Sequence, residues 1–435
     1  MSPIWNPEYE CMDRSALHEL QLRRLQMTVS WMWERVPYYR ARMEEIGVRP
    51  RDIRSLDDVR RLPLTDKTAL RDTYPFGMFA VPLEEVVRLH SSSGTTGKPI
   101  VVGYTRGDIN TWSECTARVS SAAGVHRGDL ADLAFLYGMF TGGWGMHYGI
   151  ERIGATVIPA GSGNTERHIM MMQDFGTTVF VSTPSYALYL AEVADTMGVD
   201  VRALPLRLGL FGGEPTSTAA KREIEERLGI RATDNWGLSE AMGPGVSGEC
   251  ECACGLHINE DHFLWEIIDP DTQEPLGPGE MGEMVITPLT KEAFPVLRFR
   301  TRDLTRVTTE RCECGRTMAR MDAVHQRTDD MLIIRGVNVF PSQIEDVLFK
   351  IEGIRPHYLV VVERKQALDE LEIRLEVEEA VFSDIMADMV AFQKNVADRL
   401  QSVLGLRAKI TLVEPGTIER TAGKSKRVLD LRPQE

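Results

Sequence analysis

The segment from Ser91 to Pro99 combines hydroxyl residues, two glycines and a lysine just before a strand-like run, Ile100 to Val102. Glycine lets backbone N–H groups approach phosphate oxygens closely, and a lysine adds a point charge. In the GxxxxGK[ST] phosphate loop the lysine opens a helix, whereas here it precedes a proline and a strand. A flexible surface loop is the alternative, but the order of residues favours a phosphate-binding loop. We assign to it Ser91, Ser92, Ser93, Gly94, Thr95, Thr96, Gly97 and Lys98.

A second candidate group contains cysteines. Five of the seven cysteines form two clusters, which are Cys250, Cys252 and Cys254 and, farther along, Cys312 and Cys314. Seven cysteines are too few for a disulfide framework at this length, and in a reducing compartment such crowding indicates a metal. Structural zinc takes four nitrogen or sulfur ligands, and His257 follows the first cluster closely. A reduced, metal-free cluster is the alternative interpretation.

Size and composition limit the possible functions. A chain of 435 residues exceeds the size at which single cores stop growing, so we expect a large and a smaller domain. Its formal charge of −14 disfavours nucleic acid as a partner, because binding to phosphate backbones rests on clustered Lys and Arg. No segment has the roughly 20 consecutive apolar residues that span a bilayer, and the N-terminus has no signal-peptide pattern. We therefore expect a cytoplasmic protein without a membrane partner.

The elements that must position these groups follow from hydrophobic periodicity. Residues 14–36 show apolar side chains at helical spacing, and Pro37 ends the pattern. Between about 85 and 290, short apolar runs alternate with segments of helical pattern, which predicts an α/β domain of sheets packed with helices. These runs are Ile100–Val102, Ala155–Ile158, Val179–Val181, Leu208–Phe211 and Met284–Ile286.

The pattern changes after Asp329. We predict a small α+β domain with a helix over 342–351, strands over 357–363 and 371–377, a helix over 383–404 and a strand over 408–413. Ser342 and Glu345 have the spacing of a capping box, and Gly353 is the expected helix end. The predicted domains are therefore 1–328 and 329–435, joined by a short hinge at Asp329.

Four motifs occur in a fixed order along the chain. They are the loop at 91–99, the segment Asn235–Glu240, the segment Arg300–Asp303 and the pair Gly423-Lys424, with the run Asp330–Gln343 between the last two. With them the chain resembles the phenylacetate–CoA ligase branch of the adenylate-forming acyl- and aryl-CoA synthetase superfamily over nearly its whole length. The resemblance implies a large AMP-binding domain, a small mobile C-terminal domain, a homodimer, and ATP-dependent joining of an aryl-acetic acid to coenzyme A through an acyl adenylate.

The resemblance also implies roles for single residues. Glu240 would hold Mg2+ between phosphate oxygens, Trp236 would stack on adenine, and Asp303 would accept from the ribose hydroxyls. Arg327 would reach the ribose or phosphate. The further residues assigned to the binding of nucleotide or coenzyme A are Glu214, Asp234, Asn235, Gly237, Arg335 and Gly336.

Lys424 is implied as the catalytic lysine that bridges the substrate carboxylate and the α-phosphate, with Lys426 as its rival. The C-terminal domain is expected to rotate between the half-reactions, which would bring Arg335 and Gly336 to the coenzyme A tunnel.

The resemblance places the acid between two segments. Tyr137 and Phe140 belong to a glycine-rich aromatic segment that ends at Gly145, which suits a flat apolar ligand. The other residues assigned to the acid pocket are Gly212, Gly213, Ala241, Met242, Gly243 and Pro244. For zinc, the comparison with the family favours Cys250, His257, Cys312 and Cys314, although Cys252 or Cys254 can replace Cys250.

Two other functions fit parts of the pattern. An enzyme that loads an aryl acid onto a carrier-protein thiol would share every motif named above. A non-catalytic, zinc-containing nucleotide-binding protein would need neither Lys98 nor Lys424, and their presence disfavours it.

Overall fold

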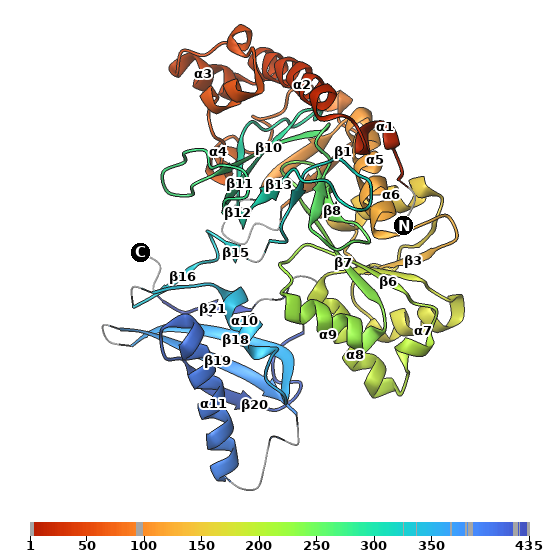
Figure 1. Ribbon diagram of the computed structural model, residues 1–435, viewed down its shortest axis with the longest axis vertical. Coiled ribbons are helices and arrows are strands. Elements are labelled where there is room, and N and C mark those ends of the chain that lie inside the picture. Colours follow the sequence, from red (N-terminus) through yellow and green to blue (C-terminus); the bar gives the residue numbers. More distant parts are fainter. Residues whose placement is uncertain are drawn as a thin grey trace. The chain divides into compact units, whose positions relative to one another are not determined.

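The computed structural model describes residues 4–92, 99–324, 326–335, 337–365, 368–378, 381, 386–420, 425 and 427–432 (Figure 1). The chain divides into two compact units. Unit 1 comprises Met1–Ser182, Ala203–Gly213 and Arg231–Ala323, and unit 2 comprises Thr183–Arg202, Glu214–Ile230 and Val324–Glu435. The predicted α/β class is confirmed. Unit 2 contains two segments from the middle of the chain besides its C-terminal part, and the domain division at residue 328 stays a prediction.

Unit 1 begins with helices. The predicted helix over 14–36 is α2 (Arg14–Arg35), and Asp13 caps it by accepting from the Ser15 N–H. Pro37 does end the pattern, but it also opens α3 (Pro37–Glu45), because proline suits the first turn of a helix. The remaining short helices of this region are α1 (Pro7–Glu10), η1 (Pro50–Asp52), η2 (Leu56–Arg61), α4 (Lys67–Asp72) and η3 (Leu83–Glu85).

A nine-stranded sheet forms the centre of unit 1, with the order β13-β14-β9-β8-β7-β6-β5-β3-β4. The strands are β3 (Leu130–Leu133), β4 (Thr156–Ile158), β5 (Val179–Ser182), β6 (Leu208–Phe211), β7 (Arg231–Leu238), β8 (Gly243–Glu249), β9 (Leu256–Ile258), β13 (Val307–Thr308) and β14 (Arg320–Met321). Strands β4, β3, β5, β6 and β7 are parallel, and β8 then runs antiparallel to β7. Strands β5 and β6 are buried at every position, which explains why the parallel strands appear in the sequence as continuous apolar runs.

Two smaller sheets complete unit 1. Strands β10 (Phe263–Ile268), β11 (Gly282–Pro288) and β12 (Phe299–Thr305) pair in that order and are antiparallel. Strands β1 (Arg88–Ser91) and β2 (Val101–Tyr104) form an antiparallel pair with Ser91 opposite Val101.

Helices α5 (Arg106–Ala123), α6 (Thr141–Ile153) and α7 (Thr165–Phe175) belong to unit 1. Thr105 and Asp108 form a capping box at the start of α5. Glycines of α6 allow a close approach to α5, since a Cβ at Gly149 would lie 2.4 Å from Thr116 Oγ1. A Cβ at Gly145 would lie 2.6 Å from both Trp112 and Pro244. Gly145, the last residue of the glycine-rich aromatic segment, therefore allows close packing of side chains.

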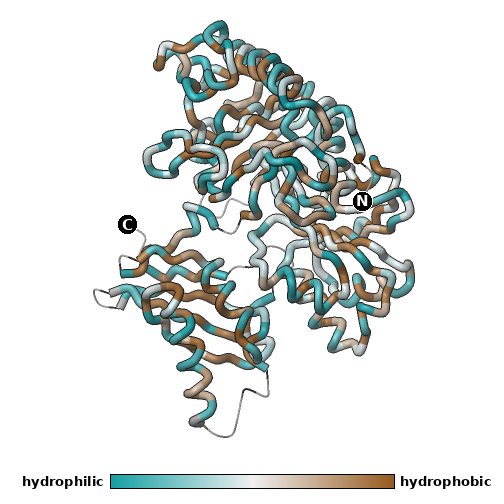
Figure 2. Tube along the Cα trace, viewed as in Figure 1, coloured by the Kyte–Doolittle hydropathy of each residue, from teal (hydrophilic) through white to brown (hydrophobic). Residues whose placement is uncertain are grey.

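Unit 2 contains a four-stranded sheet with the order β20-β19-β18-β21. Its elements are α8 (Pro184–Met197), η4 (Val201–Ala203), α9 (Thr218–Leu228), β15 (Gln326–Arg327), β16 (Leu332–Ile334), β17 (Val337–Val339), α10 (Pro341–Leu348), β18 (Ile354–Lys365), β19 (Leu368–Val377), α11 (Met386–Leu404), β20 (Lys409–Val413) and β21 (Val428–Asp430). Hydrophobic residues lie along β18 and β19, as Figure 2 shows, and their buried side chains pack against α10 and α11. The predicted helices and strands of this part are confirmed, except that residues 383–385 of the second helix lie outside the described residues. The short strands β16, β17 and β21 were not predicted.

The predicted capping box of the helix after Asp329 is wrong. Phe340 is the N-cap of α10, its N–H donates to Gln343 Oε1 at 3.1 Å, and Pro341 occupies the first helical position. The fixed φ of proline suits that position, so the helix begins before Ser342. Glu345 instead accepts from the hydroxyl of Tyr358 at 2.9 Å. Gly353 is not the helix end either, since α10 ends at Leu348.

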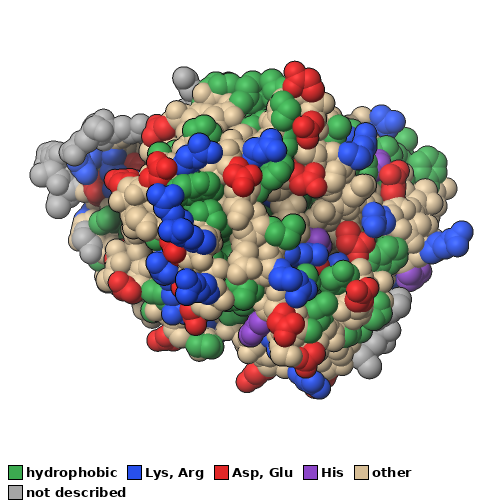
Figure 3. All heavy atoms as spheres, turned by 90° about the horizontal axis from the view of Figure 1, so that it is seen from above, with side chains coloured by type: hydrophobic (Ala, Val, Ile, Leu, Met, Phe, Trp, Pro, Cys, Tyr) green, Lys and Arg blue, Asp and Glu red, His purple; other side chains and the backbone are tan. Residues whose placement is uncertain are grey.

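The surface carries charged side chains of both signs, as expected from a sequence with 50 Lys and Arg and 64 Asp and Glu residues. Lys and Arg side chains are interspersed with Asp and Glu side chains over the face seen in Figure 3. None of the helices in the part of the chain that the structure describes is both long and apolar enough to span a bilayer.

Candidate functional site

The predicted phosphate loop starts at Ser91, the last residue of β1, and continues towards β2. The Ser91 N–H donates to the Met139 carbonyl at 2.9 Å, and the Ser92 N–H donates to the Ile100 carbonyl at 3.0 Å. The hydroxyl of Ser92 accepts from the Ile100 N–H at 3.2 Å. These bonds fix where the loop leaves and rejoins the sheet. The predicted residues Ser93, Gly94, Thr95, Thr96, Gly97 and Lys98 lie outside the described residues.

Two residues predicted to bind the nucleotide, Trp236 and Asp303, are hydrogen-bonded to each other in unit 1. The indole Nε1 of Trp236, at the end of β7, donates to Asp303 Oδ2 of β12 at 2.9 Å. Trp236 is half-buried and Asp303 is buried. The bond orients the indole ring beside a carboxylate, an arrangement that suits a planar base joined to a hydroxyl-bearing sugar.

The neighbours of Trp236 fix the backbone there. Asn235 donates from Nδ2 to the Phe211 carbonyl at 2.9 Å, and the Asp234 N–H donates to Glu249 Oε2 at 2.9 Å. A Cβ at Gly212 would lie 2.6 Å from the Asn235 carbonyl, so the ends of β6 and β7 approach closely. Gly213 has a φ of 87°, in the left-handed region that favours glycine.

The connection from β7 to β8 is unusually tight. A Cβ at Gly237 would lie 2.0 Å from the Gly243 carbonyl oxygen, a separation that no side chain can occupy. Gly243 itself has a φ of 108°. The connection contains Glu240, whose side chain is 5% exposed and has no hydrogen-bond or ion-pair partner within the described residues. A mostly buried carboxylate that no described residue pairs with suits a cation ligand.

The two segments predicted to bind the acid are neighbours in unit 1. Thr141 Oγ1, beside Phe140, lies 2.9 Å from Ser239 Oγ of the β7–β8 connection. The Tyr137 hydroxyl lies 3.0 Å from His147 Nδ1, and its ring packs edge-on against Trp144. Phe140 is 40% exposed, whereas Ala241 and Met242 are fully buried.

Unit 2 holds the other predicted residues. Arg327 Nε lies 3.0 Å from Asp329 Oδ1, so the predicted phosphate ligand and the predicted hinge form an ion pair. Arg335 donates to the Asp369 carbonyl at 2.7 Å. Glu214 accepts from the Ser185 N–H at 2.8 Å and from the Ser425 N–H at 3.1 Å. The predicted residues Gly336 and Lys424, and the rival Lys426, lie outside the described residues.

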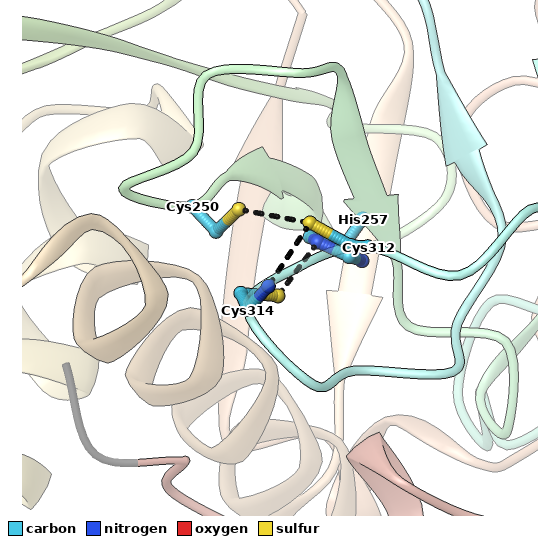
Figure 4. A group of neighbouring side chains, drawn as sticks. All are labelled: Cys250, His257, Cys312 and Cys314. Carbon is cyan, nitrogen blue, oxygen red and sulfur yellow. Dashed lines mark hydrogen bonds between the residues drawn. The ribbon is translucent and has the colours of Figure 1, made fainter. Parts of the chain in front are cut away.

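The cysteine clusters converge in unit 1 (Figure 4). The ligand atoms of Cys250, His257, Cys312 and Cys314 all lie within 4.8 Å of one another. The sulfurs of Cys250 and Cys312 are 3.7 Å apart, and Cys314 Sγ lies 3.4 Å from His257 Nε2. Three sulfurs and one imidazole nitrogen at these separations fit the edges of a tetrahedron around zinc.

Cys254 lies beside this group but differs from it. Its sulfur is 3.3 Å from Cys312 Sγ, yet the residue is exposed, whereas Cys250 is buried. The hydrogen bond between Cys250 and Cys314 lowers the pKa of the Cys314 thiol and raises the pKa of the Cys250 thiol. The group therefore favours a thiolate at Cys314 even as a bare protein site.

A buried cluster that the sequence analysis missed contacts Met242 of the second predicted acid segment. Lys291 is 3% exposed, and its Nζ lies 3.1 Å from the centre of the Tyr104 ring. Burial lowers the pKa of Lys291 from 10.5 to about 8, although the nearby Asp108 and Glu292 oppose the shift. No sequence signal points to it, because a single lysine between two strands is usually a surface residue.

Comparison with known proteins agrees with this geometry. A family model described as AMP-binding enzyme matches residues 61–288, and a model described as AMP-binding enzyme C-terminal domain matches residues 336–432. The chain is 48% identical to the phenylacetate-coenzyme A ligase of Thermus thermophilus, over 99% of this chain and 100% of that protein. It is also 48% identical to the phenylacetate-coenzyme A ligase of Escherichia coli, over 96% of this chain and 95% of that protein.

A solved structure is similar as well. The crystal structure of 2-hydroxyisobutyryl-CoA ligase in the postadenylation state, in complex with R3-HIB-AMP, superposes with a TM-score of 0.91. It is 33% identical, and the match covers 98% of this chain and 91% of that one.

The buried Lys291 generates a prediction about pH. Below pH 8 both the folded and the unfolded chain carry the proton, so burying the ammonium destabilises the fold in full. Between pH 8 and 10.5 the unfolded chain binds more protons, so stability rises with pH. The pKa shift corresponds to about 3 kcal/mol, and loss of the cation–π contact offsets about 1 kcal/mol of it.

We therefore expect Lys291→Met to unfold at higher urea than the wild type at pH 7, by about 2 kcal/mol in free energy of unfolding. The gain should vanish by about pH 10. Lys67→Met, at a partly exposed position, is the control and should change stability equally at both pH values. A wild type that is the more stable protein at pH 7 would contradict the prediction.

Proposed function

Because the chain belongs to the phenylacetate–CoA ligase family of AMP-binding enzymes, it is an AMP-forming acid–CoA ligase, and we propose that its acid is phenylacetate or a closely related aryl-acetic acid. The observation that carries the proposal is the identity of 48% over 99% of the chain to a ligase of that name. The enzyme adenylates the acid with ATP, releasing pyrophosphate, and the thiol of coenzyme A then displaces AMP to give the thioester.

The first step brings the acid's carboxylate against the α-phosphate, so cations and backbone donors must offset the repulsion. We assign this role to the N–H groups of the loop 91–97, to Lys98, and to Mg2+ held by Glu240. The buried carboxylate of Glu240 supports a role as cation ligand. The bond between Trp236 and Asp303 supports adenine stacking on the indole and ribose binding by the carboxylate.

The remaining residues assigned to nucleotide binding are of two kinds: some position the backbone at the end of β7, and others belong to unit 2. Asp234, Asn235 and Gly237 hold the end of β7 where adenine would lie. Arg327 would contact the ribose or phosphate, with Asp329 as the hinge, and the ion pair between them supports a linked role.

Unit 2 also contains the residues assigned to each half-reaction. Lys424 would bridge the carboxylate and the α-phosphate during adenylation. Glu214 accepts from the N–H of Ser425, which follows Lys424 directly, and this bond supports a role for Glu214 in holding that segment. Arg335 and Gly336 would line the coenzyme A tunnel in the second half-reaction.

For the acid pocket we propose two walls in unit 1. The first wall is formed by Tyr137 and Phe140, and the second by the segment Ala241–Pro244 with Gly212 and Gly213 beside it. The hydrogen bond between Thr141 and Ser239 supports this proposal, because Thr141 follows Phe140 directly and Ser239 lies two residues before Ala241. A ring buried between them gains about 25 cal/mol for each Å2 of apolar surface removed from water.

We propose that Cys250, His257, Cys312 and Cys314 hold one structural zinc ion. Three thiols and an imidazole within 4.8 Å support it, since a closed N/S set is typical of structural zinc. Zinc held by four protein ligands would stabilise the loops between β8, β9 and β14 and would not take part in the reaction.

A cytoplasmic location and a homodimer are also proposed. The seven cysteines are all free, which is usual in a reducing compartment. The dimer rests on the resemblance to the family alone.

The function is tested by an acid panel with pyrophosphate release as the signal. We expect phenylacetate to exceed acetate in kcat/KM by roughly thirtyfold, since burying the ring gives about 2 kcal/mol. Octanoate and 2-hydroxyisobutyrate complete the panel, the latter because a 33% identical relative is named for it. Each acid is run with coenzyme A, with a phosphopantetheinylated carrier protein, and with neither. A best rate with octanoate or 2-hydroxyisobutyrate would overturn the substrate, and thioester on the carrier alone would overturn the acceptor.

The two half-reactions separate the lysines. Lys424→Ala should abolish acyl-adenylate formation, while phenylacetyl adenylate supplied to the variant still reacts with coenzyme A. Lys426→Ala is the matched control and should retain both half-reactions. Two results would contradict the role of Lys424. One is an equal loss of both half-reactions in Lys424→Ala, and the other is a loss of adenylation in Lys426→Ala but not in Lys424→Ala.

The zinc proposal predicts close to one zinc per chain in protein purified without added metal. Cys250→Ser should lose the zinc and unfold at lower temperature, whereas Cys254→Ser, which replaces the exposed neighbour, should keep both. Elemental analysis and thermal melting provide the two measurements. Folded wild-type protein without zinc and with every thiol open to titration would contradict the site, and zinc loss in the Cys254 variant would change its ligands.

A further inference from the structure

A stack of three side chains lies behind the proposed acid pocket. Lys291 Nζ covers the Tyr104 ring at 3.1 Å, and the Tyr104 ring stacks on Trp112 with centres 4.9 Å apart and planes 18° apart. Lys291 is 3% exposed, and the other two side chains are fully buried. The ammonium has no carboxylate within ion-pair distance among the described residues, so the aromatic face is its main support.

The stack donates its hydrogen bonds to the second wall of the pocket. The Tyr104 hydroxyl donates to the Met242 carbonyl at 2.8 Å, and Trp112 Nε1 donates to the Pro244 carbonyl at 2.9 Å. Between them, a Cβ at Gly243 would lie 2.5 Å from the Trp112 ring, so the ring packs directly on the backbone. Both bonds therefore act on the same three residues of the wall.

The sheet does not hold this segment regularly. The register between β7 and β8 shifts between Trp236 and Leu238, so the ladder is irregular where the second wall begins. Where ladder bonds are interrupted, side-chain donors decide where the backbone lies. The N–H groups of Ala241 and Met242 donate to the Leu238 carbonyl, both at 3.1 Å, and the bonds from Tyr104 and Trp112 hold the carbonyls of Met242 and Pro244 in addition.

The same cluster also reaches the first wall. The ring of His90 packs edge-on against Tyr104 and Trp112, with centres 5.4 and 5.8 Å away. Its Nδ1 lies 3.1 Å from the carbonyl of Met139, the residue before Phe140. Since a carbonyl only accepts, the proton is on Nδ1. One buried cluster is thus bonded to both walls.

We propose that His90, Tyr104, Trp112 and Lys291 are positioning residues that set the separation of the two pocket walls and so determine which acids the enzyme accepts. This inference rests on the proposed function, because it takes these segments to be the acid-binding walls. None of the four side chains needs to touch the substrate. Lys291 keeps Tyr104 against Trp112, and the two aromatic donors and His90 fix the backbone that does touch it.

The test compares Tyr104→Phe with Tyr39→Phe. Tyr104→Phe keeps the stack and the cation–π contact but loses the bond to Met242. Tyr39 is equally buried, and its hydroxyl bonds Thr65 Oγ1 and the Leu297 N–H, both at 3.1 Å, without contact to either wall. Steady-state kinetics with phenylacetate, 1-naphthylacetate and ATP are measured for both variants and the wild type.

We expect Tyr104→Phe to raise KM for phenylacetate about fivefold, the worth of one hydrogen bond, and to lower the preference for phenylacetate over 1-naphthylacetate by a similar factor. KM for ATP should stay within about twofold, because the nucleotide residues are untouched. Tyr39→Phe should leave the preference unchanged. Lys291→Met should lower the preference although its stability at pH 7 rises, a combination that a purely structural lysine would not give.

The proposal is overturned if Tyr104→Phe and Lys291→Met retain the wild-type preference and KM for the acid, as Tyr39→Phe does. Failure of the proposed function is seen separately, because the wild type itself would then ligate no aryl-acetic acid.

Discussion

The contact between Gly237 and the Gly243 carbonyl is the constraint on which the site depends. With 2.0 Å between that oxygen and any Cβ at residue 237, only two glycines allow β7 to reverse into β8 so tightly. The reversal follows the last parallel strand of the sheet and places Trp236, Glu240 and the segment up to Pro244 within one short stretch. The proposed adenine contact, cation ligand and acid wall therefore depend on the tight reversal from β7 into β8. A shift of the backbone at this reversal would move all three.

Prediction from sequence succeeded where the signal was local. Buried parallel strands such as β5 and β6 are continuous apolar runs, so the order of residues alone is enough to recognise them. The predicted capping box at Ser342 was wrong because Pro341 occupies the first helical position, so the helix begins before Ser342. The spacing of Ser342 and Glu345 alone does not reveal this. Among the predicted site residues, Trp236 and Glu240 belong to one sequence motif, and their roles stay predictions. The stack of Lys291 on Tyr104 joins residues far apart in sequence, and its members have ordinary local patterns, so only the fold could reveal it.

Two buried charged groups of unit 1, Asp108 and Lys291, differ in how their burial is offset. Asp108 accepts from three backbone N–H groups, of Thr105, Glu292 and Ala293, so its burial is offset by hydrogen bonds and it holds the segment of Lys291 to the start of α5. Lys291 itself has no ion-pair partner among the described residues: it gains the aromatic face, a weak contact with Met242 Sδ at 3.9 Å and the longer-range attraction of Asp108 and Glu292. A group that lowers stability without a strong partner is more easily explained by function than by folding.

An acidic protein that binds anionic substrates must concentrate its favourable contacts. A formal charge of −14 gives no general attraction for ATP or coenzyme A, and salt screens charges that are more than about 8 Å apart, so attraction must come from groups close to the phosphates. Backbone N–H groups and single cations act at that range, and their effect is greatest where water is excluded. This favours a site in which rigid elements fix each donor in advance. The hydrogen bonds from Tyr104 and Trp112 to the carbonyls of Met242 and Pro244 contribute to that rigidity. Flexible donors would spend more of their hydrogen bonds on water, and the net charge of the protein would not compensate for the loss.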